Sequence, residues 1–157
     1  MSEALSQPAR RHVFLDKAQP ASYKAAAGLS DQVGAAAEAA GLDRRFVELI
    51  NLRVSQVNGC AYCLDLHHHR AIEAGESERR IAVLDAWQET ALFDERERAA
   101  LQLAESITRL PEPLERAYVE DHARAVLGDE AYSAVAWVAI TMNAFNRISI
   151  TSHHPVK

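Results

Sequence analysis

Cysteines, clusters of basic residues and long apolar runs are all scarce in this chain of 157 residues. No apolar segment is long enough to cross a bilayer, which argues against a membrane-spanning protein. The 17 Lys and Arg residues are scattered among 22 Asp and Glu residues, and the net charge is −5. No basic surface for nucleic acid or for an anionic membrane is therefore expected.

The chain has two cysteines, Cys60 and Cys63, which is too few for a disulfide framework. Its N-terminal stretch, MSEALSQPARRHVFLD, lacks an apolar core of signal-peptide length, so we expect a cytoplasmic protein. A permanent structural disulfide is not expected in that reducing compartment. The two thiols must therefore be inert, bound to a metal or redox-active.

Strand-like alternation of apolar and polar residues is absent after the first 20 residues, and helix signals take its place. Asp43 is placed as a helix N-cap, and Asp94 with Glu97 forms a capping box. We predict one all-α domain, a helical bundle over residues 21–152, with an N-terminal arm at 1–20 and a short tail at 153–157. The predicted helices cover residues 22–41, 43–57, 60–75, 94–110, 114–127 and 129–150.

The last predicted helix, DEAYSAVAWVAITMNAFNRISI, is too apolar to be solvated on all sides. Two interpretations are open: the helix is the central helix of the domain, which is favoured, or it forms part of a subunit interface. Trp137, Met142 and Phe145 are assigned to the core by default. Asn143, Asn146 and Arg147 need partners if they are buried, so they are expected to brace the core, the site or an interface.

Cys60, Cys63 and His67 lie at positions i, i+3 and i+7 of a predicted helix, on one face within about 60° of arc. Cys60 falls in the first turn, where free N–H groups and the helix dipole lower the pKa of a thiol. Cβ atoms at i and i+3 are about 5–6 Å apart in a regular helix, whereas a disulfide needs about 3.5–4.5 Å. A first turn frayed by Gly59 would close that gap, which favours a reversible bond.

Glu48 lies on the preceding helix among apolar neighbours. A carboxylate in such a place is most commonly a surface residue. If Glu48 is buried, its pKa rises and it carries a proton near neutral pH, in partnership with His67. A thiolate that attacks an O–O bond, an acid for the leaving oxygen and a second thiol that resolves the sulfenic acid are the components of a thiol peroxidase.

The segment ELINLRVSQVNGCAYCLDLH, residues 48–67, resembles the signature of the alkyl hydroperoxidase D (AhpD)-like family, part of the carboxymuconolactone decarboxylase-like superfamily. Its glutamate, two cysteines and histidine match that signature at every spacing. The resemblance continues through RAIEAGES, ERERAALQLAESIT and AITMNAFNRI and covers roughly residues 20–150. The chain departs from the family pattern at Tyr62, the residue before the second cysteine, where the best-studied members have a histidine.

The resemblance implies an all-helical fold, peroxidase activity toward organic hydroperoxides and homo-oligomers built on trimers, either trimers or hexamers. It assigns Cys63 as the peroxidatic thiol, Cys60 as the resolving thiol that first meets the reductant, and Glu48 with His67 as the proton relay. The partners would be a small hydroperoxide and a dithiol reductant, either a protein or a small thiol, and no cofactor is expected. Helix-dipole reasoning instead makes Cys60 the more acidic thiol, and we follow the resemblance.

Several alternatives remain open. Structural zinc would use Cys60, Cys63 and His67, but the fourth ligand would have to come from His12, His122, His153 or His154, none of which shows ligand spacing. A thioredoxin-like oxidoreductase would need a strand before the cysteines. A non-enzymatic redox sensor or chaperone would use the same thiols as a switch. A decarboxylase-type lyase of the superfamily does not depend on a thiol pair.

Overall fold

The fold is all helical over residues 11–157, the part of the chain that the computed structural model describes. No strand forms in that part, and the predicted all-α class is confirmed. The elements are α1 (Leu15–Ala18), α2 (Pro20–Ala39), α3 (Arg44–Asn58), α4 (Ala61–Glu73), α5 (Glu78–Ala82), the 3₁₀ helix η1 (Leu84–Glu89), α6 (Glu95–Arg109), α7 (Pro113–Leu127) and α8 (Asp129–Ser152).

Helix starts are fixed by the side chains that the sequence marks for this role. Asp43 accepts a hydrogen bond from the backbone N–H of Phe46 at 2.8 Å, which caps α3. The capping box of α6 is complete, because Asp94 accepts from the N–H of Glu97 and Glu97 accepts from the N–H of Asp94, both at 2.9 Å. Both predicted caps are confirmed.

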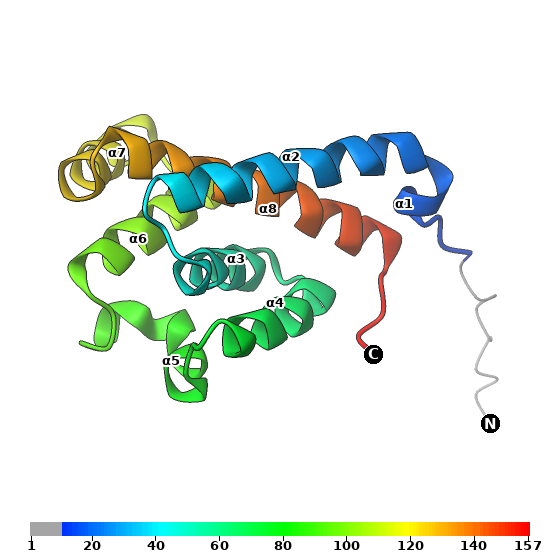
Figure 1. Cartoon of the computed structure of the whole chain (residues 1–157), viewed down its shortest axis with the longest axis horizontal. Helices are drawn as coiled ribbons and strands as arrows, with labels where there is room; N and C mark the ends of the chain where they lie inside the picture. The colour runs from blue at the N-terminus through cyan, green and yellow to red at the C-terminus, as the bar shows by residue number, and fades with distance from the viewer. Residues whose placement is uncertain (1–10) are drawn as a thin grey trace, which may run out of the picture.

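Helices α3 and α8 form the centre of the bundle (Figure 1). α3 packs against α4, α6 and α8, while α8 also packs against α2, α6 and α7. Val54 on α3 and Val135 and Ala139 on α8 are completely buried between them. The prediction that the last helix is central is therefore confirmed. Over residues 11–157, no helix, α8 included, has the length and apolarity needed to cross a membrane.

One face of α8 is left uncovered. Trp137 is 48% exposed and Ile140 46% exposed, so the assignment of Trp137 to the core is wrong for the single chain. The helical period explains the difference, because Val138 and Met142 take the inward face and Trp137 falls on the outward one. Met142 is buried as predicted, and Phe145 packs at the edge of the core.

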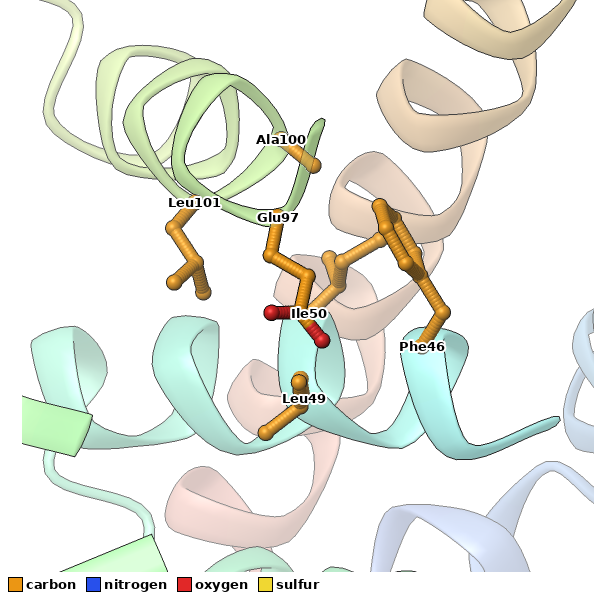
Figure 2. A pocket seen from close by; sticks show the side chains of 6 residues that line it. All are labelled: Phe46, Leu49, Ile50, Glu97, Ala100 and Leu101. Carbon is orange, nitrogen blue, oxygen red and sulfur yellow. The ribbon is translucent and has the colours of Figure 1, made fainter. Parts of the chain in front are cut away.

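The contact between α3 and α6 is tightly filled. Figure 2 shows Phe46, Leu49 and Ile50 of α3 facing Ala100 and Leu101 of α6, with the carboxylate of Glu97 between the two helices. These side chains leave no cavity large enough for a water molecule. The buried Glu97 is paired with Arg80 at 2.6 Å, which also donates to Glu76 at 2.8 Å. This contact is structural and offers no room for a ligand.

A second buried ion pair fixes α3 against α6 and η1. Nε of Arg53 donates to Glu105 at 2.6 Å, and its Nη1 donates to Asp85 at 2.5 Å. The indole N–H of Trp87 donates to the same Glu105 oxygen at 2.7 Å. A buried charge is tolerated when it is paired and hydrogen-bonded, as here. The network sets the position of α3, which carries Glu48.

The ends of the described chain lie together beside α8 (Figure 1). Residues 15–18 form α1 rather than an extended arm, and the N–H of Leu15 donates to Ser152 at 3.0 Å. In the tail, His154 lies 3.1 Å from Asp16. The first ten residues of the predicted arm fall outside the described part, and the domain boundaries at residues 20 and 152 remain a prediction.

We expect Asp94→Ala to lower the free energy of unfolding by about 1 kcal/mol, because it removes the N-cap and breaks the capping box of α6. Urea denaturation followed by circular dichroism measures the change. Glu95→Ala, an exposed change in the same turn, is the matched control. Equal stability of the two variants would contradict the assigned cap.

Candidate functional site

The two cysteines lie where α3 turns into α4. Gly59 ends α3 in the left-handed conformation, with φ of 68°, which glycine adopts without steric cost. The N–H of Cys60 then donates to the carbonyl of Ser55 at 3.1 Å, which completes the turn. Cys60 is the N-cap of α4, with an extended backbone, and so lies one residue before the first turn in which the sequence placed it.

Cys60 and Cys63 are joined as a disulfide, with their Cα atoms 5.3 Å apart. That separation lies within the usual range for a disulfide. Because Cys60 is outside the regular helix, the bond forms without the frayed first turn that helical spacing predicted. The N–H of Cys63 also donates to the sulfur of Cys60 at 3.3 Å. The helix N-terminus is therefore directed at Cys60.

Glu48 and His67 form a buried hydrogen-bonded pair. Nδ1 of His67 donates to Oε2 of Glu48 at 2.6 Å, and the two residues are 6% and 5% exposed. Asn51 donates to the same carboxylate oxygen at 3.4 Å. The structure thus buries Glu48 rather than leaving it at the surface. Within residues 11–157, Nε2 of His67 carries no hydrogen bond to protein.

A groove of about 1380 Å³ runs between α2, α3, α4, α8 and the C-terminal tail. Glu48, Cys63 and His67 all line it, so three of the four predicted site residues share one space. Cys60 does not line the groove. The buried hydroxyl of Thr141 also lines it and has no hydrogen-bond partner in the described chain. Apolar contacts come from Val47, Leu66, Val138, Met142 and Phe145.

The remaining histidines of α4 take no part in this site. His68 lies 3.0 Å from Glu78, and Nδ1 of the exposed His69 lies 2.8 Å from the carbonyl of Asp65. Both side chains lie away from the groove lining. Among residues 11–157, no group of three or more His, Cys, Asp or Glu side chains is placed to hold a metal ion.

The comparisons with known proteins concern the family and the fold. A model of the Carboxymuconolactone decarboxylase family matches residues 20–106, which is more than half of the chain. The chain belongs to this family. An uncharacterized Bacillus subtilis protein, YdfG, is 39% identical over 109 residues, which cover 69% of this chain and 74% of YdfG.

Two further matches concern AhpD. The alkyl hydroperoxide reductase AhpD of Coxiella burnetii is 44% identical over 41 residues, which cover 26% of this chain and 23% of that protein. A crystal structure from Agrobacterium tumefaciens, of a protein of unknown function described as a candidate antioxidant defence protein AhpD, superposes with a TM-score of 0.82. It is 31% identical, and the match covers 94% of this chain and all of the other. The predicted AhpD-like membership is confirmed.

In this AhpD-like chain, His154 lies beside Tyr62, the residue that stands where the best-studied AhpD-like proteins have a histidine. Their rings are 5.3 Å apart with an edge-on orientation, and both residues line the groove. Nε2 of His154 lies 3.1 Å from Asp16, and Nδ1 lies 3.3 Å from Ser149. Desolvation raises the pKa of Asp16, but the hydrogen bond and charge of His154 outweigh it, and the pKa lies below its ordinary value.

The sequence placed His154 in the tail and otherwise marked it only as a possible fourth zinc ligand. The contact with Asp16 joins residues 138 positions apart, and nothing in the local sequence marks such a pair. The tertiary packing of α1 on α8 brings the two side chains together. They form a second carboxylate–imidazole pair at the same groove.

Asparagines of α8 hold the turn that carries the cysteines. Asn58, the last residue of α3, donates to the side-chain oxygens of Asn143 and Asn146, both at 2.9 Å. Asn146, which is fully buried, donates in turn to Ser55 at 3.0 Å, and Asn143 donates to Thr108 at 2.9 Å. The two amides thus find partners and tie the end of α3 to α8, whereas Arg147 is exposed and donates to the side-chain oxygen of Asn143.

We expect Asn146→Ala to lower the free energy of unfolding by about 1–3 kcal/mol, because it leaves the buried Ser55 hydroxyl and one Asn58 N–H without their partner. Thermal or urea unfolding measures the loss. Thr151→Ala, an exposed change on the same helix, should change stability by no more than about 0.5 kcal/mol. An equal loss in both variants would argue against the bracing role.

Proposed function

We propose that this AhpD-like protein is a thiol-dependent peroxidase that reduces organic hydroperoxides by cycling Cys60 and Cys63 between dithiol and disulfide. Hydrogen peroxide is a further candidate substrate. The observation that carries the proposal is the buried Glu48–His67 pair, 2.6 Å apart, at the groove that Cys63 also lines. Thiol, imidazole and carboxylate together supply the nucleophile and the acid that cleavage of an O–O bond needs.

In the oxidative step, the thiolate of Cys63 attacks the outer oxygen of the hydroperoxide and breaks the O–O bond. The released alkoxide takes a proton and leaves as an alcohol, while Cys63 becomes a sulfenic acid. The thiol of Cys60 then attacks the Cys63 sulfur, which releases water and forms the disulfide. The two cysteines together lose the two electrons that the hydroperoxide gains.

His67 is the group placed to move the proton. Glu48 accepts from Nδ1, so Nε2 is free to take the proton of the Cys63 thiol and deliver it to the leaving oxygen. The carboxylate of Glu48 fixes the orientation of the ring and stabilises its protonated form. The Thr141 hydroxyl, unpartnered and at the same groove, is available to hydrogen-bond a bound hydroperoxide.

A non-enzymatic redox sensor or chaperone is the second candidate, because the same reversible disulfide would serve as a switch. Continued turnover in the presence of a dithiol separates the two: a peroxidase consumes peroxide repeatedly, whereas a sensor is oxidised once. The family name also includes decarboxylases. That lyase chemistry does not depend on a thiol pair, so the Cys60–Cys63 disulfide supports it less.

We further propose that the chain forms homo-oligomers, trimers or hexamers, and works in the cytoplasm with a dithiol protein or a small thiol as reductant. The uncovered apolar face of α8 with Trp137 and Ile140 supports self-association, because large exposed apolar patches commonly mark protein interfaces. A reducing compartment would also keep the dithiol available.

Mixing the reduced protein with cumene hydroperoxide or tert-butyl hydroperoxide should remove two free thiols per chain, because one disulfide forms. Thiol counting after an acid quench measures this loss. Cys63→Ser should abolish peroxide consumption in steady state with a dithiol donor. Retention of both thiols in the wild-type protein would end the proposal.

Glu48→Gln should slow peroxide consumption by about 100-fold or more, because His67 loses the carboxylate that stabilises its protonated form. Glu78→Gln is the matched control, since it breaks the exposed carboxylate–imidazole pair of Glu78 and His68 between α5 and α4, and Glu78 lies away from the groove lining. Circular dichroism checks that both variants fold. Similar rates in the two variants would contradict the relay.

Trp137→Glu should shift the protein toward monomer in size-exclusion chromatography with light scattering, because the exposed apolar face of α8 would be buried in the proposed oligomer, where a charge is costly. Arg79→Glu, on the exposed surface of α5, provides the control for a change of charge alone. An oligomeric wild type whose mass is unchanged by Trp137→Glu would place the interface elsewhere.

A further inference from the structure

The C-terminal tail, residues 153–157, lines one side of the groove. His153 caps α8 with a left-handed φ of 51°, and the chain then turns toward the start of α4 (Figure 1). Outside glycine this conformation is uncommon, and it persists where surrounding contacts fix it. The tail residues His154, Pro155 and Lys157 all line the groove. The course of the tail therefore depends on the contacts that it makes with the rest of the fold.

The imidazole of His154 is the centre of these contacts. Its Nε2 lies 3.1 Å from a carboxylate oxygen of Asp16, and its Nδ1 lies 3.3 Å from the hydroxyl of Ser149. The ring stacks on Phe14, with 5.8 Å between the centroids, and meets Tyr62 edge-on at 5.3 Å. Contacts from the start of α1, from α4 and from α8 thus converge on one side chain, which is only 16% exposed.

The part of the groove around this imidazole is apolar and lies beside a cysteine. Phe14, Tyr62 and Pro155 line the groove next to His154, and together they are called the tail wall below. Tyr62 immediately precedes Cys63 on α4. Hydrogen peroxide has no apolar surface to bury against the tail wall. An alkyl or aryl hydroperoxide has such a surface, and its removal from water is favourable.

We propose that His154 is a specificity-determining residue that favours bulky organic hydroperoxides over hydrogen peroxide. Its contact with Asp16, called the tail latch below, holds the tail wall in place beside Cys63. The tail wall binds the organic group of the hydroperoxide, while proton transfer remains with His67 and Glu48. The inference rests on the proposed peroxidase function and assigns no covalent step to the tail latch.

A tenfold preference is within the capacity of the tail wall. A factor of ten corresponds to about 1.4 kcal/mol, and at about 25 cal/mol per Å² it needs about 55 Å² of apolar surface removed from water. An aromatic side chain buries about 150–250 Å² in a protein core. The phenyl group of cumene hydroperoxide therefore has to place only about a third of such an area against the tail wall.

The first test compares two oxidants. His154→Ala should lower the ratio of kcat/KM for cumene hydroperoxide to kcat/KM for hydrogen peroxide by about tenfold, because only the organic substrate loses apolar contact. A general loss of structure or of thiol reactivity lowers both values and leaves their ratio unchanged. Asp16→Ala breaks the tail latch from the other side and should lower the ratio in the same way. The double variant should lower it by no more than about a further twofold, because each substitution removes the same contact.

His153→Asn is the matched control. His153 is exposed, lies outside the groove lining and contacts the ring of His12 at 4.1 Å. Asparagine tolerates the left-handed backbone of this position, so the ratio should stay within about twofold of wild type. Circular dichroism checks that all variants fold. An unchanged ratio in folded His154→Ala or Asp16→Ala would overturn the proposal, and so would an equal fall in His153→Asn.

The second test needs no catalysis. The alcohol 2-phenyl-2-propanol, which reduction of cumene hydroperoxide yields, carries the same phenyl group without the O–O bond. Ligand-detected NMR titration should give a dissociation constant about tenfold higher for His154→Ala than for the wild-type protein. Equal binding by the two proteins, or no binding by the wild type, would overturn the proposal.

The two tests separate this inference from the peroxidase proposal. If the wild-type protein consumes neither peroxide but binds the alcohol with the expected dependence on His154, the peroxidase proposal falls and the tail latch stands. If both peroxides are consumed at a ratio that His154→Ala does not change, the peroxidase proposal stands and this inference falls.

Discussion

The buried hydrogen bond between Glu48 and His67 is the interaction around which the site is organised. It joins α3 to α4 across 19 residues and places an acid–base pair at the groove that Cys63 lines. Removing two polar groups from water is unfavourable unless each finds a partner. At 2.6 Å the two groups satisfy one another, while Nε2 of the imidazole is left available for chemistry.

The turn between α3 and α4 gives the two sulfurs different surroundings. Gly59 lets α3 end abruptly, and Asn146 holds that end to α8 through Asn58 and Ser55. As a result Cys60 is the N-cap of α4 and Cys63 lies in its first turn. Both are almost fully buried, and Cys63 also lines the groove.

Local chemistry explains which features were predictable. The caps at Asp43 and Asp94 and the helix stop at Gly59 depend on neighbours within a few residues, so the sequence marks them directly. Trp137 was misassigned because apolar character on α8 does not reveal which face the other helices cover. The contact of His154 with Asp16 spans 138 residues and follows from the packing of α1 on α8.

The sequence by itself determined the all-α class and the helix ends, which follow from hydrophobic period and capping, features that act over short distances along the chain. The resemblance to AhpD-like proteins, also taken from the sequence, selected Glu48, Cys60, Cys63 and His67 as the candidate site. Only the tertiary structure decided that Glu48 is buried, that Cys63 rather than Cys60 lines the groove, and that Tyr62 lies against His154. Burial and access depend on which helices lie across from a residue, and spacing within one helix does not contain that information.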